Sequence, residues 1–190
     1  MNFMRFFAKV TLLVATLLAV PVTSFGQVRP EYDRDHFGGW ADTDRDCLNT
    51  RHELLAQLST GTVKLSANGC RVVRGRWLDP YTDVIFTDSS DLDIDHLVPL
   101  HWAWVHGAWA WSAALRTDFA NDQRNLLAVD DGTNREKGAK GPLEWLPPSV
   151  DFACQYASRF WRVVLIYGLV VEEPEAKAMQ QQRAIVCFDG

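Results

Sequence analysis

Short apolar stretches with a two-residue alternation dominate the chain between residues 60 and 100. The segments 63–67, 70–77 and 82–87 alternate apolar with polar residues or are rich in β-branched residues, which is typical of β-strands. The run LDIDHLV at 92–98 follows as a further strand. This part of the chain therefore predicts a group of short strands.

The flanking segments have helical patterns instead. Residues 46–59 form the pattern of an amphipathic helix, with Cys47, Leu54, Leu55 and Leu58 on or near one face. The Trp/Ala-rich segment 101–115 is more helical than extended. We expect its Trp residues to pack in the core. Farther along the chain we predict a short strand at 124–130, followed by the start of a short helix or a loop at 132–142.

Two long helices are predicted at the end of the chain, at 149–168 and 172–187. Ser149 is suited to cap the first helix and Gly168 to end it. Because strands come first and helices later, we expect an α+β fold rather than a parallel α/β fold.

The first 26 residues differ from the rest. Arg5 and Lys9 precede the apolar run 10–20, and small residues follow it, which is the pattern of a secretory signal peptide. A retained N-terminal anchor is the alternative. We therefore predict a signal peptide at 1–26 and one domain at 27–190, secreted to the periplasm or the medium, with no stable membrane association after cleavage.

Export suggests how the four cysteines are used, because disulfides persist in oxidising compartments. Cys154 lies near the start of one C-terminal helix and Cys187 at the end of the other. The helical spans 154–168 and 174–187 have nearly equal lengths of about 20 Å, so an antiparallel hairpin of the two helices brings these sulfurs together. That leaves Cys47 to pair with Cys70. Free thiols or a four-cysteine zinc site are the weaker alternatives, since no CxxC spacing occurs.

The net charge of −5 becomes −7 after residues 1–26 are removed, since that segment carries two cations and no acids. Such a charge argues against a broad, high-affinity nucleic-acid binder, which needs clustered Lys and Arg. An enzyme that meets a polyanion at a local basic patch remains compatible with it.

The chemistry of the sequence centres on Asp95 and His96, two polar residues inside an apolar run. A distortion before Pro99 could turn both side chains toward one site, and Asn134 at the predicted helix start could join them. Carboxylate and amide oxygens suit Mg²⁺, and an unligated imidazole beside them can take a proton from water. These groups suffice to hydrolyse a phosphodiester.

Three motifs carry a resemblance to a known family: DIDHLVPL at 93–100, FANDQRNLLAV at 119–129 and TNREKGAKGPLEWLPP at 133–148. With them the chain resembles the HNH (ββα-metal) nucleases, and most closely a secreted branch related to the C-terminal nuclease domain of GmrSD-type restriction enzymes. YDRDHFGGW, CLNTRHELL and GRWLDPYTDVIF also look like that branch. The similarity covers most of residues 31–190.

The resemblance implies a role for each matching residue. His96 would be the general base, Asp95 and Asn134 would hold one divalent metal, and Asn125 would brace the loop that positions His96. The metal would be Mg²⁺, with Mn²⁺ as the alternative. The implied fold is a ββα-metal core with additional strands and a disulfide-stapled C-terminal helical hairpin.

Four basic residues are candidates for phosphate contacts: Arg51, Arg135, Lys137 and Lys140. Solvated positions are the alternative for each. Asp93 could support a metal ligand, although a solvated turn is the simpler interpretation.

The function implied is a secreted, metal-dependent endonuclease that cleaves DNA, with RNA as a further candidate substrate. We expect little sequence specificity, because contacts to the backbone carry no sequence information. We also expect a monomer. An exported, disulfide-stapled binding module without catalysis and a zinc hydrolase are the competing hypotheses.

Overall fold

The computed structural model describes residues 28–188, so the predicted signal peptide lies outside the described residues. The strands are β1 (Lys64–Leu65), β2 (Val72–Leu78), β3 (Ile85–Asp88), β4 (Leu92–His96) and β5 (Leu126–Asp130). The helices are α1 (Thr50–Leu58), α2 (Leu100–Val105), α3 (Ala113–Asn121), α4 (Asp131–Lys137), α5 (Val150–Tyr167) and α6 (Glu173–Phe188). The expected α+β fold is confirmed. Among residues 28–188, no helix combines the length and the apolar character needed to span a membrane.

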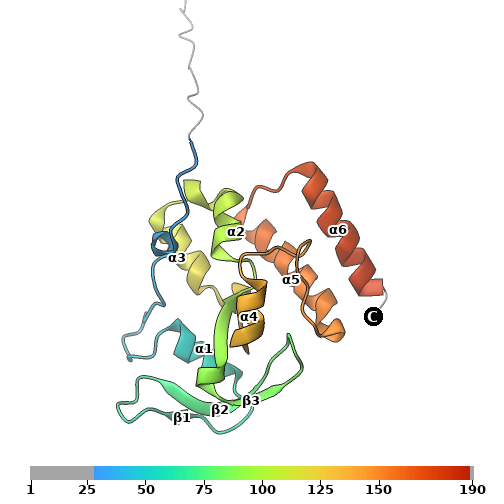
Figure 1. Ribbon diagram of the computed structural model, residues 1–190. Coiled ribbons are helices and arrows are strands. Elements are labelled where there is room, and N and C mark those ends of the chain that lie inside the picture. The colour runs from blue at the N-terminus through green and yellow to red at the C-terminus, as the bar shows by residue number, and fades with distance from the viewer. Residues whose placement is uncertain (1–27, 189–190) are drawn as a thin grey trace, which may run out of the picture.

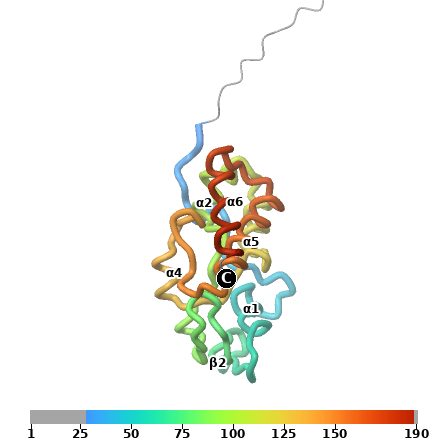
Figure 2. Tube along the Cα trace, turned by 90° about the vertical axis from the view of Figure 1, so that its right-hand side faces the viewer, coloured from blue at the N-terminus to red at the C-terminus, as the bar shows by residue number. Residues whose placement is uncertain are grey.

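The strands form two separate antiparallel sheets. β1, β2 and β3 make a three-stranded sheet at one end of the molecule, away from α2 and α6 (Figures 1 and 2). β4 and β5 make a two-stranded ribbon, in which Leu92 pairs with Asp130 and His96 with Leu126. The ribbon is the part of the fold that carries the candidate site.

Helix α4 follows β5 without a connecting loop. The side chain of Asp130 accepts a hydrogen bond of 2.7 Å from the Thr133 backbone N–H, which caps the start of α4. α4 then packs against both strands of the ribbon. In Figure 2, α4 lies on the left of the molecule and α1 on the right. The β4–β5–α4 unit therefore has the strand–strand–helix order that the motif spacing predicts.

Two apolar clusters hold these elements together. The larger joins the ribbon to the helices and includes Trp102 and Trp104, so the expectation that these tryptophans belong to the core is confirmed. The smaller lies between α1, β2 and β4 and contains Leu54 and Leu55. Leu58, the last residue of α1, lies three and four residues after Leu55 and Leu54 and so shares their face of the helix, although it is 42% exposed. Cys47 precedes α1, so its predicted place on this helix is wrong.

The C-terminal hairpin has the geometry that the cysteine spacing predicts. α5 and α6 pack together and are joined by a disulfide between Cys154 and Cys187. Gly168 ends α5 in the left-handed conformation, with φ of 60°, where a side chain would be strained. The second disulfide joins Cys47 and Cys70, as predicted.

The disulfide of the hairpin is expected to contribute measurably to stability. It closes a sequence separation of 33 residues. The double variant Cys154→Ser/Cys187→Ser should therefore lose about 3 kcal/mol of unfolding free energy in urea titrations. In a reducing buffer the variant and the wild type should unfold at nearly the same urea concentration. Equal midpoints in oxidising buffer would contradict the stabilising role.

Candidate active site

A cleft of about 450 Å³ lies between the ribbon, the start of α2, α4 and the N-terminal segment. Asp93, Asp95, His96 and Asn134 all line it. The cleft therefore brings together the Asp-His pair and the distant amide that the sequence analysis combined into one site. Asp93 also belongs to the residues that line the cleft, whereas the simpler interpretation of the sequence placed it in a solvated turn.

His96 stands at the end of β4 with its ring held on two sides. The side chain is buried, and its Nε2 lies 2.8 Å from the Ala120 carbonyl oxygen. Because a carbonyl only accepts hydrogen bonds, this contact places the ring proton on Nε2 and leaves Nδ1 as the acceptor. The indole of Trp40 stacks on the imidazole, with the two ring planes parallel and the ring centroids 5.3 Å apart.

Burial also sets the protonation state of this imidazole. It lowers the pKa of His96 to about 3, against the opposing effect of the hydrogen bond to Ala120. The ring is therefore neutral at pH 7. A neutral imidazole with a fixed tautomer is a group that can accept a proton at Nδ1.

The loop that follows His96 is fixed by Asn125, which is completely buried. Its side-chain oxygen accepts from the Val98 N–H at 2.8 Å, and its side-chain amide donates to the Val98 carbonyl at 3.2 Å. The Asn125 backbone carbonyl accepts from the Leu97 N–H. These bonds hold the chain directly after His96, which is the arrangement that a bracing role requires.

Asp95 belongs to a buried ion pair. The ammonium of Lys137 lies 2.9 Å from its carboxylate, and the Tyr81 hydroxyl donates to the same carboxylate at 2.6 Å. Burial raises the pKa of Asp95, whereas Lys137 and Tyr81 act in the opposite direction. The same ammonium donates to the His96 carbonyl at 2.9 Å, so one cation fixes both residues of the pair.

The expected phosphate contact of Lys137 does not fit this position. Its side chain is 0% exposed, and its ammonium is already bonded to Asp95 and His96. Lys137 lies one helical turn after Asn134 on α4, on the face that packs against the ribbon. A solvated or phosphate-binding position was expected, but the helix turns this lysine toward the core.

Asn134 bonds to Asp93. The side-chain amide of Asn134 donates to the Asp93 carboxylate at 3.0 Å, and both groups line the cleft. Because the amide nitrogen is engaged, the side-chain oxygen of Asn134 is left for another partner. Asp93 is therefore a strand residue in contact with a candidate ligand.

The other three basic candidates differ in their positions. The Arg51 guanidinium lines the cleft and donates to the carbonyls of Ser89 and Leu92. Arg135 pairs with Asp131, and the Lys140 ammonium donates to the carbonyl of Glu136. Neither Arg135 nor Lys140 lines the cleft. Of the four, only Arg51 lines the cleft, while Arg135 and Lys140 are exposed outside it and their phosphate contacts stay a prediction.

Sequence reasoning gave no role to three residues of the cleft: Tyr32, Arg34 and Trp40. They come from the polar, glycine-containing segment before α1, and no periodicity connects that segment to the motif around His96. The only signal was its inclusion in the family resemblance. Their position follows from tertiary packing.

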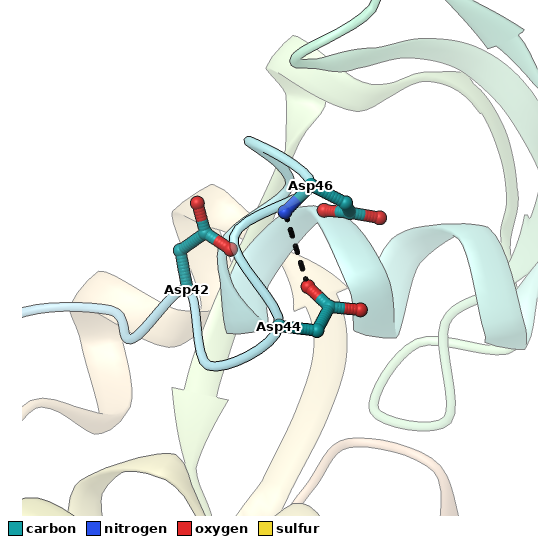
Figure 3. Close-up of side chains that lie close together, drawn as sticks. All are labelled: Asp42, Asp44 and Asp46. Atoms are coloured by element: carbon teal, nitrogen blue, oxygen red, sulfur yellow. Dashed lines mark hydrogen bonds between the residues drawn. The ribbon is translucent and has the colours of Figure 1, made fainter.

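A group of carboxylates that the sequence analysis did not single out lies in the loop before α1 (Figure 3). Asp42, Asp44 and Asp46 are exposed and each offers an oxygen within 4.8 Å of the others. They accept backbone hydrogen bonds from residues 46 to 48 of the same loop. These bonds account for the carboxylates as turn residues, and none of the three lines the cleft.

Comparisons with known proteins identify the family of the chain. The sequence model of the family described as GmrSD restriction endonucleases, C-terminal domain, matches residues 31–182. A protein of Arthroderma benhamiae described as an uncharacterized secreted protein is 38% identical over 159 residues, which cover 80% of this chain and 76% of that protein. No solved structure matches the chain.

The buried ion pair predicts that substitutions of Lys137 and Lys140 change the unfolding free energy by different amounts. Lys137→Met should lower the unfolding free energy by about 3–5 kcal/mol, because it leaves the Asp95 carboxylate buried without its cation. Lys140→Met is the control: its ammonium is exposed, and the change should stay within about 0.5 kcal/mol. Urea titration measures both, and equal effects of the two substitutions would contradict the ion pair.

Proposed function

We infer the function from one premise: the chain belongs to the family of GmrSD restriction endonuclease C-terminal domains. We propose that it is a secreted, metal-dependent endonuclease of the HNH type, which hydrolyses phosphodiester bonds of DNA and, as a further substrate, RNA. The main support is the geometry of His96, a neutral imidazole whose Nε2 is held by a backbone carbonyl beside carboxylate and amide oxygens.

In this proposal His96 is the general base. The bond from Nε2 to the Ala120 carbonyl keeps the proton on that nitrogen, so Nδ1 is the atom that takes a proton from water. A carbonyl behind the ring also stabilises the imidazolium that forms. A phosphodiester beside the ring favours the protonated form, so we expect the pKa of His96 to rise when substrate binds.

Asp95 and Asn134 are the proposed metal ligands. The contacts to Lys137 and Tyr81 leave part of the acceptor capacity of the Asp95 carboxylate free. The bond to Asp93 leaves the side-chain oxygen of Asn134 free and fixes its orientation. This oxygen donor set fits Mg²⁺, and Mn²⁺ as the alternative. A bound divalent ion would neutralise charge on the phosphate and the leaving oxygen.

Secretion is part of the proposal and has two supports. The relative from Arthroderma benhamiae is described as secreted, and the chain forms two disulfides, which persist in oxidising compartments. The signal-like pattern of residues 1–26 agrees with them. Little sequence specificity and a monomeric state remain expectations.

Digestion of plasmid DNA tests the activity. We expect cleavage with Mg²⁺ and none with EDTA. His96→Ala should reduce the rate by at least about 100-fold, because the general base is lost. His106→Gln is the control, since His106 pairs with Glu175 outside the cleft and should keep the activity. Equal activity with Mg²⁺ and EDTA, or an active His96→Ala variant, would contradict the mechanism.

Metal titrations test the ligand set separately. Asn134→Ala should shift half-maximal activity to about 10- to 100-fold higher Mg²⁺, and Asp93→Asn should cause a smaller shift, because it only weakens the orientation of Asn134. Asp131→Asn removes an exposed carboxylate of α4 that pairs with Arg135, and it should leave the titration unchanged. A wild-type curve for Asn134→Ala would remove this residue from the metal site.

A further inference from the structure

The segment before α1 is firmly attached to the helical part of the molecule. We call residues 30–41 the N-terminal strap; it lies against α3 and α2 in Figure 1, drawn in blue. The Trp104 indole N–H donates to the Pro30 carbonyl at 3.0 Å, and Arg116 donates to the His36 carbonyl at 2.9 Å. Phe37 is completely buried in the larger cluster.

The end of the strap is fixed as well. Asn121, the last residue of α3, accepts from the Ala41 N–H at 2.9 Å and donates to the Gly39 carbonyl at 3.2 Å. The Trp40 between them is thereby held with its ring parallel to that of His96. The strap is thus a preorganised wall of the cleft, and its side chains need little reordering to meet a ligand.

Arg34 is the cation that the strap brings to the cleft. It is exposed and lines both the cleft and the adjoining hollow between Trp40 and His96. Within residues 28–188 the guanidinium has no hydrogen-bond or ion-pair partner. The neighbouring Asp33 carboxylate accepts from the Asp35 N–H of the same turn.

The other cations near the site are less available. Arg51 also lines the cleft, but one of its guanidinium nitrogens already donates to two backbone carbonyls, those of Ser89 and Leu92. Lys137 is buried in the ion pair with Asp95. With a net charge of −5 the chain has little general attraction for a polyanion, so a phosphate needs a local positive group.

We propose that Arg34 is a substrate-binding residue, which donates to the non-bridging oxygens of the phosphate that enters the cleft beside His96. A guanidinium suits this role because its planar donors match two phosphate oxygens at once. The assignment rests on the proposed nuclease function and extends the site from the β4–β5–α4 unit to the N-terminal strap.

Binding in EDTA tests the assignment without cleavage. Fluorescein-labelled DNA, single-stranded and duplex, is titrated with the full chain at several KCl concentrations. For Arg34→Ala the slope of log K against log [KCl] should become shallower by about 0.7 to 0.9, which corresponds to one lost phosphate contact. Arg34→Lys should keep the wild-type slope. Arg183→Ala is the matched control, since Arg183 lies on α6 and does not line the cleft.

Turnover with Mg²⁺ gives the second measurement. We expect Arg34→Ala to lower kcat/KM by about 10- to 100-fold, Arg34→Lys by less, and Arg183→Ala not at all. The urea midpoint of Arg34→Ala should equal that of the wild type, because the Arg34 side chain is exposed and makes no hydrogen bond or ion pair with the residues that the structure describes.

The two proposals fail in different ways. A wild-type salt slope and wild-type kcat/KM for Arg34→Ala would overturn the role of Arg34 while the nuclease function stands. So would cleavage by a wild-type protein that shows no measurable DNA binding in EDTA at any KCl concentration. A wild-type chain that binds DNA through Arg34 but cleaves neither DNA nor RNA with any divalent metal would overturn the nuclease function and keep the binding role.

Discussion

The buried ion pair between Asp95 and Lys137 is the interaction on which the site depends. It connects the first strand of the ribbon to the end of α4, and its ammonium also holds the His96 carbonyl. Breaking such a pair is costly because the remaining charge stays buried without compensation. The cation that looks like a phosphate ligand in the sequence therefore acts within the fold.

The two-residue repeat of the strand and the helical repeat of α4 place two pairs of contacting residues between β4 and α4. Asp93 and Asp95 are two residues apart on β4 and share one face of the strand, while Asn134 and Lys137 are three residues apart on α4 and share one face of the helix. The inner contact is the ion pair, and the outer one is the bond from Asn134 to Asp93 at the cleft. The outer contact can thus serve chemistry while the inner one holds the helix in place.

The cleft is assembled from parts that are distant in sequence and have different tasks. β4 supplies His96, and the strap supplies Trp40 and Arg34. The end of α3 supplies the Ala120 carbonyl that binds the His96 ring, and the turn before β5 supplies Asn125, which holds the loop after His96. The strap is held by the buried Phe37 and by hydrogen bonds to α2 and α3. The packing of the strap against α2 and α3 therefore decides whether Trp40 and Arg34 are present at the cleft.

Much of the fold follows from local rules that act within short segments. Alternation along 70–77 and 92–98 predicts β2 and β4, Gly168 ends α5, and equal helix lengths bring Cys154 and Cys187 together. In each case the physical cause is a backbone preference or a length that the chain carries by itself.

The direction in which each side chain points is not local. The sequence marks Lys137 and Arg34 only as two cations near motifs. Packing buries the first, because α4 lies flat on the ribbon, and leaves the second free at the cleft, because the strap is pinned against α2 and α3. Which charge serves the fold and which faces solvent depends on contacts between segments about 40 to 80 residues apart, and only the tertiary structure decides it.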